Sequence, residues 1–203
     1  MCVPTHEPTS EHEQPYWNDG LLVAGIDEAG RGALAGPVVA AAVVFHPMSF
    51  PEGLNDSKVL KPDERAAAAL AIKASALAWR IAFVDNHRID TVNILQATYD
   101  AMWLAIDGLA VEPHHLLVDG NRFRAHRLPS TTIIDGDALS VSIAAASILA
   151  KTARDAWMAE EAHVRHPAYG FDRHKGYGTV HHREAIRLNG PCVLHRHTFL
   201  GNL

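Results

Sequence analysis

The chain of 203 residues has little cysteine and lacks any long apolar run. Only Cys2 and Cys192 occur, so we expect no disulfide framework and no cysteine zinc site, and a reducing compartment suits the protein. No stretch reaches the roughly 18 apolar residues of a membrane span, because the most apolar segment, 33–45, is too short. The polar residues 1–18 lack the apolar core of a signal peptide. We therefore expect a cytoplasmic protein without a membrane partner.

Internal repeats, low-complexity tracts and the phosphate-binding motif G-x-x-x-x-G-K-[ST] are also missing. The absence of that motif argues against a nucleotide-binding switch. A hydrophobic content of 48% with 20% charged residues is typical of a globular protein. The length suits one domain that can bury its own core. We expect residues 1–20, which are polar, to form a flexible N-terminal leader and residues 21–203 to form the folded domain.

The chain lacks an excess of positive charge, since its formal net charge is −5, and this taken alone argues against a nucleic-acid partner. The charge is unevenly distributed, however. Residues 1–150 carry ten Lys and Arg against 18 Asp and Glu, whereas residues 151–203 carry eight against five, with seven histidines. A basic C-terminal face could hold a polyanion while an acidic centre binds metal. The histidines could equally belong to a solvated surface.

Apolar periodicity and turn residues predict the order of the elements. Apolar runs predict strands over residues 21–27, 37–45, 79–84, 115–118 and 131–134. Helical spacing and N-terminal helix signals predict helices over residues 62–78, 95–108, 141–163 and 180–188. Small residues at 144–147 would permit close packing of the third helix against a sheet. The order implies a mixed, roughly five-stranded sheet flanked by helices.

Acidic residues follow three of the predicted strands: Asp27 with Glu28, then Asp119, then Asp135 with Asp137. If these strands are neighbours, the acids form one cluster, which would need cations to neutralise it. Mg²⁺ prefers one or two carboxylates plus phosphate oxygens of a substrate, and a pair of cations ~3.5–4 Å apart supports in-line displacement at phosphorus. The alternative is that acids after strands are turn formers and helix caps. Consecutive strand residues face opposite sides, so the first pair can share a site only at a strand end or bulge.

A glycine-rich turn, Gly30-Arg31-Gly32, follows the first acidic pair at once. Such a turn brings bare backbone N–H groups and a guanidinium to one place, and both suit a phosphodiester. The segment from Gly25 to Gly32 therefore indicates metal-assisted chemistry on a phosphate backbone.

Six segments stand in order along the chain: GIDEAGRGALAGPVVAAAVV, LNDSKVLKPDER, NILQATYDAM, LLVDGN, GDALSVSIAAASILAKTARD and YGFDRHKGYGT. Together they resemble bacterial ribonuclease HII, over about residues 21–199. The resemblance implies an RNase H-like fold, in which a mixed five-stranded sheet is flanked by helices and followed by a small helical C-terminal element. It makes residues 21–203 the catalytic domain. The related ribonuclease HIII has an added N-terminal domain, for which residues 1–20 leave too little chain.

The resemblance also implies an activity. A protein of this family is a metal-dependent endonuclease that hydrolyses the RNA strand of RNA–DNA hybrids, including single ribonucleotides embedded in duplex DNA. It uses Mn²⁺ or Mg²⁺, leaves 3′-hydroxyl and 5′-phosphate ends, needs no protein nucleophile and acts as a monomer. The alternative is a non-catalytic nucleic-acid-binding module whose acids only form turns, and metal-dependent nicking of a hybrid duplex would discriminate between the two.

The resemblance assigns roles to particular residues. The family's four catalytic, metal-binding acids correspond to Asp27, Glu28, Asp119 and Asp137. The Gly30-Arg31-Gly32 loop corresponds to the backbone that contacts the ribose 2′-hydroxyl, and Tyr177 to the tyrosine that helps to sense the ribonucleotide. Lys58 and Lys175 correspond to plausible phosphate contacts, although surface lysines would fit the same pattern.

Two positions depart from the family pattern. Ala33 stands where many members have proline, so the loop is expected to be less rigid. Asp135 stands where lysine is common and adds an acid two residues before Asp137. We expect Asp137 to face the metals, because its Gly-Asp dipeptide and its distance to residues 144–147 match the family.

Overall fold

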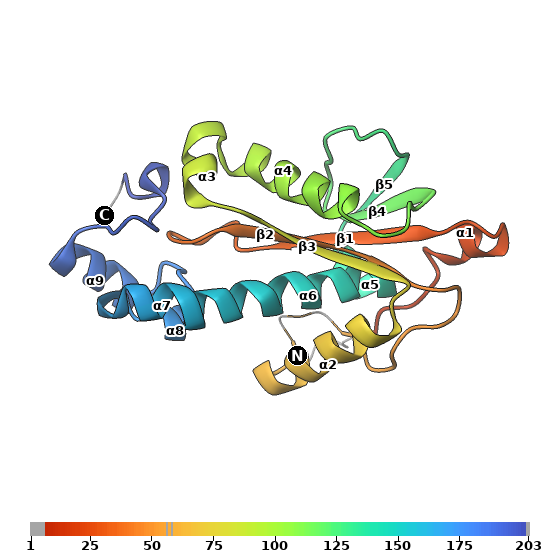
Figure 1. Ribbon diagram of the computed structural model, residues 1–203, viewed down its shortest axis with the longest axis horizontal. Coiled ribbons are helices and arrows are strands. Elements are labelled where there is room, and N and C mark those ends of the chain that lie inside the picture. Colours follow the sequence, from red (N-terminus) through yellow and green to blue (C-terminus); the bar gives the residue numbers. More distant parts are fainter. Residues whose placement is uncertain (1–6, 56, 58, 202–203) are drawn as a thin grey trace, which may run out of the picture.

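A computed structural model describes residues 7–55, 57 and 59–201, and its centre is one five-stranded sheet (Figure 1). The strands are β1 (Val23–Ala29), β2 (Val38–Val44), β3 (Ala78–Val84), β4 (His115–Asp119) and β5 (Ser130–Ile133). Their order is β3-β2-β1-β4-β5. β2 is antiparallel to both β1 and β3, whereas β1, β4 and β5 are parallel. The mixed, helix-flanked sheet expected from the sequence is confirmed.

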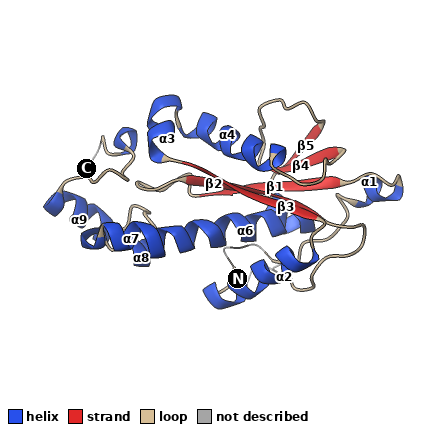
Figure 2. Cartoon of the chain, in the orientation of Figure 1, coloured by secondary structure: helices blue, strands red, loops and turns tan. Residues whose placement is uncertain are grey.

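Helices cover both faces of the sheet (Figure 2). The elements outside the sheet are α1 (Gln14–Asn18), α2 (Pro62–Ser75), α3 (Asn86–Val92), α4 (Ile94–Asp107), α5 (Gly136–Leu139), α6 (Val141–Trp157), η1 (Met158–Ala162), α7 (His163–Arg165), η2 (Pro167–Tyr169), α8 (Phe171–His174), α9 (Val180–Asn189) and η3 (His197–Phe199). α4 lies on one face and α6 on the other, while the short elements from α7 onward gather beyond the end of α6 (Figure 1). None of the helices in the described part of the chain has the length and apolar character to cross a membrane.

α6 lies unusually close to β1, as its run of small residues predicts. A Cβ added to Gly25 in β1 would stand 2.1 Å from the backbone carbon of Ser142, so only glycine fits beneath the helix. Ala145 and Ala146 are fully buried in the cluster between α6 and the sheet. On the opposite face, Ala24 and Ile26 pack in the α4 cluster. Alternate residues of β1 therefore face different helices.

Several element boundaries differ from the prediction. The helix expected over 141–163 runs without a break only to Trp157, after which the chain continues as the π-helical turn η1. α2 ends at Ser75 instead of residue 78, because Ala76 already has an extended backbone. α3 was not expected at all, since its seven residues give too short a periodic signal.

Residues 9–20, which we expected to form a flexible leader, contact the folded domain. The amide of Thr9 donates to the carbonyl of Leu139 at 3.1 Å. The fully buried carboxylate of Glu13 accepts a hydrogen bond from the Ser140 hydroxyl at 2.5 Å and another from the Ser142 amide at 3.0 Å. Trp17 is also buried. The polar composition of this segment gave no indication of these contacts. Glu13 accepts hydrogen bonds at the start of α6, where the first backbone amides of a helix lack partners within the helix.

Candidate active site

The strand register places the first acids together. β1 and β4 are parallel, with Ile26 opposite Val118 as their last paired residues. The next residues along the two strands are Asp27 and Asp119, which therefore lie at the same end of the sheet. Glu28 extends from the opposite face of β1, because its strand is still regular there and pairs with β2. Asp27 thus faces α6 and Glu28 faces α4, and both stand near the end of β1, where their carboxylates can belong to one site.

The fourth acid comes from the turn after β5. The amide of Gly136 donates to Oδ1 of Asp119 at 2.8 Å, which ties the start of α5 to the end of β4. Asp137 follows directly and is only 5% exposed. Asp135 is exposed and has a left-handed backbone, with φ of 55°. The structure thus buries the member of this pair that we expected to face the metals.

The carboxylates repel one another. Burial raises the pKa of Asp27 well above its ordinary value, and the negative charges of Glu28 and Asp119 raise it further. A hydrogen bond from Ser147 of α6 and another from the Glu28 amide, at 2.7 Å, act in the opposite direction. A divalent cation at this strand end would relieve the repulsion that these groups exert on Asp27.

The donor set suits a hard divalent cation. The acids offer only oxygen ligands, which Mg²⁺ and Mn²⁺ prefer, and they come from two neighbouring strands and one short helix. In the described part of the chain, no three Asp, Glu, His or Cys side chains already stand in metal-binding geometry. The residues therefore fit the ion in their chemistry, and a cation would have to draw the carboxylates together to be held by three of them.

The Gly30–Gly32 loop and Tyr177 meet, although they are far apart in sequence. Ala33 and Tyr177 form an isolated antiparallel bridge, and the amide of Leu34 donates to the carbonyl of Gly176 at 2.8 Å. Tyr177, Gly30 and Arg31 line one cavity of about 460 Å³. The other residues that line it include Glu28, Ser57, Arg65, Ser147 and Lys151. The glycine loop, the tyrosine and one acid therefore share a single opening.

A second, smaller cavity lies on the α4 side. Its volume is about 270 Å³, and Glu28 and Arg31 line it together with Asp119 and Arg122. Glu28 and Arg31 therefore border both openings, and Arg31 Nη1 lies 3.1 Å from Glu28 Oε1. The two cavities, which we call together the groove, extend from the end of β4, past the glycine loop, to Tyr177. Glu28 and Asp119 line the groove, whereas Asp27 and Asp137 are buried beside it.

Two buried arginines donate hydrogen bonds to the backbone of the glycine loop and of the residues that follow it. Arg154 donates to the carbonyls of Pro37 at 2.9 Å, Ala35 at 3.1 Å and Lys175 at 2.9 Å. Arg196 donates to the carbonyls of Gly36 at 3.0 Å, Pro37 at 3.0 Å and Arg31 at 2.9 Å. Both side chains are fully buried. One arginine comes from α6 and the other from the C-terminal segment, so together they join three separate parts of the chain.

Burial also changes the electrostatics of these arginines. It lowers the pKa of Arg154, and it lowers the pKa of Arg196 to about 9, with the charge of Arg154 contributing to the second shift. A Cβ added to Gly30 would stand 1.9 Å from Arg154 Nε, so the arginine takes the space that this glycine leaves. Neither arginine was predicted from the sequence. An arginine at a position of α6 that faces the sheet was the available signal for Arg154.

Of the two predicted lysines, the structure describes Lys175. Lys58 lies outside the described residues. Lys175 has a left-handed backbone, with φ of 52°, and its Nζ donates to the carbonyl of Asp172. It lines a cavity of about 660 Å³, to which Tyr177 also contributes. Arg65, Lys151 and Arg173 line the same cavity.

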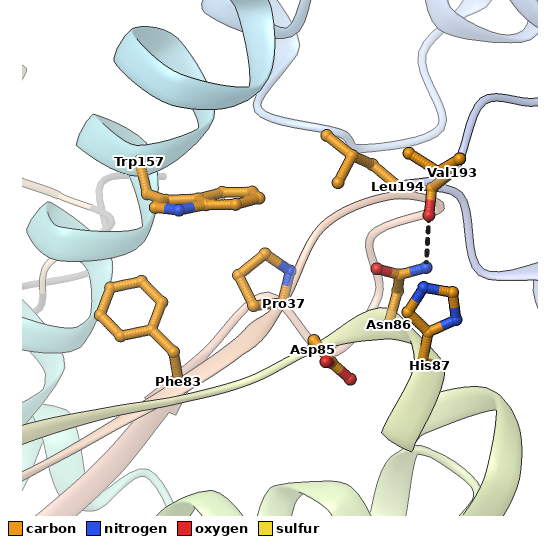
Figure 3. A pocket seen from close by; sticks show the side chains of 8 residues that line it. All are labelled: Pro37, Phe83, Asp85, Asn86, His87, Trp157, Val193 and Leu194. Atoms are coloured by element: carbon orange, nitrogen blue, oxygen red, sulfur yellow. Dashed lines mark hydrogen bonds between the residues drawn. The ribbon is translucent and has the colours of Figure 1, made fainter. Parts of the chain in front are cut away.

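An apolar cavity of about 490 Å³ lies at the β3 edge of the sheet (Figure 3). Pro37, Phe83 and Trp157 line one side of it, and Asn86 points across it toward the C-terminal segment. Asn86 Nδ2 donates to the carbonyl of Val193 at 2.9 Å. The four acids expected at the metals are absent from the residues that line this cavity, so it is not the candidate site.

Comparison with known proteins gives one consistent result. The model of the family described as Ribonuclease HII matches residues 24–201. Ribonuclease HII of Chlorobaculum parvum is 53% identical over 196 residues, which cover 94% of this chain and 95% of the relative. Ribonuclease HII of Bordetella pertussis is 52% identical over 178 residues, which cover 88% of each chain.

Solved structures support the fold. Ribonuclease H2 from Pyrococcus horikoshii aligns with a TM-score of 0.68 at 22% identity, covering 88% of this chain and 93% of that chain. Bst-RNase HIII in complex with Mn²⁺ aligns with a TM-score of 0.56 at 18% identity, covering 83% of this chain and 70% of that chain. At these identities the likeness concerns the arrangement of the elements alone.

Proposed function

The chain belongs to the ribonuclease HII family, and we propose that Asp27, Glu28, Asp119 and Asp137 are the carboxylates with which it performs the family's reaction. It is a metal-dependent endonuclease that hydrolyses the RNA strand of RNA–DNA hybrids. The observation that supports the assignment is the register of β1 and β4, which brings Asp27 and Asp119 to one strand end. The tie between Gly136 and Asp119 brings Asp137 to the same place.

In this proposal Asp27, Glu28 and Asp119 would hold Mn²⁺ or Mg²⁺, and Asp137 would complete the set. Divalent cations bound there supply an activated water and stabilise the leaving oxygen of an in-line displacement. Ser147 holds the Asp27 carboxylate in place from α6. Cleavage in this way leaves 3′-hydroxyl and 5′-phosphate ends, and it needs no side chain as nucleophile.

We propose that the Gly30–Gly32 loop and Tyr177 read the ribonucleotide. The 2′-hydroxyl is the group that distinguishes RNA from DNA at one position. A phenol and exposed backbone amides can both hydrogen-bond to it, and these groups border one cavity beside Glu28. A nucleotide placed there would present its 2′-hydroxyl to the loop while its phosphate approaches the acids. Single ribonucleotides in duplex DNA are therefore substrates in this proposal.

The remaining assignments concern binding. Lys175, with Lys58, would contact backbone phosphates, and Lys151 and Arg173 extend the basic surface beside Tyr177. We propose that the enzyme acts as a monomer. We place the enzyme in the cytoplasm, where its duplex substrate lies, and assign catalysis to residues 21–203.

A duplex with one embedded ribonucleotide tests the proposal. We expect nicking at the ribonucleotide with Mn²⁺ or Mg²⁺ and none with EDTA, and we expect Asp137→Asn to lose most of the rate. An all-DNA duplex of the same sequence is the control. Binding without any metal-dependent nicking would instead indicate a non-catalytic module.

A further inference from the structure

Two buried histidines contact each other, and one of them contacts the backbone of Tyr177. His182 of α9 and His195 of the C-terminal segment are both fully buried, and their Nε2 atoms lie 3.1 Å apart. At that distance one nitrogen donates its hydrogen and the other accepts it. The proposed cleavage of a phosphodiester does not use either ring, so the contact calls for another explanation.

The contacts of the two Nδ1 atoms indicate which ring donates the hydrogen bond between the Nε2 atoms. The amide of Cys192 donates to Nδ1 of His195 over 2.9 Å, which makes this Nδ1 an acceptor without hydrogen. The carbonyl oxygen of Cys192 lies farther from the same Nδ1, at 3.3 Å, and already accepts from the His195 amide at 3.0 Å. A neutral His195 therefore carries its hydrogen on Nε2 and donates it to His182. Nδ1 of His182 lies 3.0 Å from the carbonyl oxygen of Tyr177, which can only accept. His182 thus donates from Nδ1 and accepts at Nε2, in agreement with the first assignment.

The bonds form one continuous line in a single direction. The Cys192 amide donates to His195, His195 donates to His182, and His182 donates to the backbone of Tyr177. The line ends at a turn that needs support, because Lys175 and Gly176 both have left-handed backbones, with φ of 52° and 82°. A non-glycine residue in that region is held there by its surroundings.

We propose that His182 and His195 form a relay of hydrogen bonds that positions Tyr177 to read the ribonucleotide. This inference rests on the proposed function, since it supposes that Tyr177 contacts the substrate. The relay sets the position of the Tyr177 backbone, while Lys151 and Arg154 flank its ring at 5.3 and 5.2 Å from the ring centre. His182 and His195 are positioning residues, because they act through Tyr177.

The surroundings keep the relay neutral. His174 stacks on His182 with ring centres 4.4 Å apart, and Tyr169 lies 4.9 Å from His195. Burial lowers the pKa of His182 and of His195 to about 4. The positive charges of other histidines contribute to the same shifts: His174 acts on both rings, His195 on His182, and His166 and His197 on His195. At neutral pH each ring therefore has one hydrogen, as the line of bonds requires.

The first test is the tautomer of each ring, which does not depend on what Tyr177 contacts. Nitrogen-15 NMR of the full chain at pH 7 reports which ring nitrogen carries hydrogen, and spectra of His182→Asn and His195→Gln assign the signals. We expect hydrogen on Nδ1 of His182 and on Nε2 of His195. Hydrogen on Nε2 of His182, or a charged ring at either position, would overturn the relay.

The second test measures cleavage by the folded variants. His182→Asn keeps a donor near Nδ1, whereas His182→Leu removes it. For His182→Leu we expect cleavage at a lone ribonucleotide to fall relative to cleavage of a long RNA tract by roughly 2- to 12-fold, the range for one neutral hydrogen bond. His182→Asn should restore most of this ratio.

An unchanged ratio in His182→Leu, with thermal unfolding showing a folded protein, would overturn the proposal. If His182→Leu does not fold, the comparison passes to His195→Gln and His195→Asn. The longer glutamine amide can reach the Nε2 position and should keep the ratio, whereas the shorter asparagine should lower it, and the reverse order would count against the relay. Tyr177→Phe separates the two ideas: equal losses on both substrates would remove the reading role of the tyrosine, while the tautomers would still report on the relay.

Discussion

At the carboxylate end of the sheet, Asp27 and Asp119 lie on neighbouring strands whose register alone brings them together. At the other end of the groove, the backbone of Tyr177 pairs with Ala33, directly after the Gly30–Gly32 loop, and buried side chains from remote parts of the chain support both segments. The first region needs only regular secondary structure, and its acids repel one another. The second needs Arg154 and Arg196, whose hydrogen bonds to carbonyls are satisfied only in the complete fold.

The difference has a functional consequence. Removing one charge from the carboxylate end should leave the fold intact and stop the chemistry, because backbone pairing supports that region. Removing one buried arginine should loosen the loop and affect both stability and recognition. Chemistry and recognition should therefore fail separately.

The largest effect is expected for Asp119→Asn. The variant keeps the shape of the side chain and can still accept the hydrogen bond from the Gly136 amide. It loses one negative charge facing the cations, so the cleavage rate should fall by orders of magnitude on every substrate. Duplex affinity, measured in Ca²⁺ or EDTA, should change little. Turnover close to that of the unaltered enzyme would remove Asp119 from the mechanism.

Arg154→Lys should reduce stability and recognition together. Lysine cannot reach three carbonyls in the fixed fork of a guanidinium, and each buried acceptor left unsatisfied costs about 1–3 kcal/mol. We expect a clear loss in the free energy of unfolding, measured by urea denaturation. Arg183→Lys is the matched control, because that exposed arginine donates to one carbonyl, of Gly178, and should change stability by less than about 0.5 kcal/mol. Equal effects of the two substitutions would contradict the role given to Arg154.

The contributions of the two regions to the free energy of unfolding should also change in opposite directions with pH. His182 and His195 have an ordinary pKa of 6.5 that is lowered to about 4 in the fold, so the unfolded chain binds more protons in this interval. Their contribution to stability is complete above about pH 6.5 and is lost as the pH falls toward about 4. Asp27 acts in the opposite direction, because its pKa is raised and protonation relieves repulsion.

Unfolding measured in EDTA across this interval separates the two contributions. A double variant, His182→Asn with His195→Gln, should lose less stability than the parent chain as the pH falls from 7 to 5. The same slope in both proteins would show that the histidine pair does not titrate as its burial implies.

The smallest effect is expected for Asp135→Asn. The residue is exposed and has a left-handed backbone, which asparagine adopts readily. Rate and stability should stay close to those of the parent chain, whereas Asp137→Asn should lose most of the activity. A larger loss at 135 than at 137 would show that the exposed acid faces the metals.

The carboxylate end could be predicted from the sequence because it follows from local patterns. Apolar runs predict β1 and β4, and the acids stand directly after Ile26 and Val118. The resemblance carried by the six motifs is confirmed by the family match over residues 24–201. Burial then distinguishes Asp137 from Asp135, which the motifs alone could not do on physical grounds.

The buried arginines that hold the segments around Tyr177 could not be predicted in the same way. Arg154 and Arg196 donate to the carbonyl of Pro37, which is 117 residues from the first arginine and 159 from the second. Every residue has a backbone carbonyl, so the sequence does not indicate which one a side chain will contact. Glu13 was hidden for a similar reason, since its partners are a hydroxyl and an amide at the start of α6. Pattern analysis finds residues that face a core, whereas these residues satisfy backbone groups that only the folded chain brings near.

The central claim is that the acids perform the cleavage while Tyr177 and the glycine loop choose the nucleotide. The most direct test is the ratio of cleavage rates on a duplex with one ribonucleotide and on a duplex with a long RNA tract, measured for Asp119→Asn and Tyr177→Phe. We predict that Asp119→Asn lowers both rates alike and leaves the ratio unchanged. Tyr177→Phe loses one hydrogen bond, worth roughly 0.5–1.5 kcal/mol, and should lower the ratio because a tract offers alternative registers. An unchanged ratio in Tyr177→Phe, or a changed one in Asp119→Asn, would contradict this division of the site.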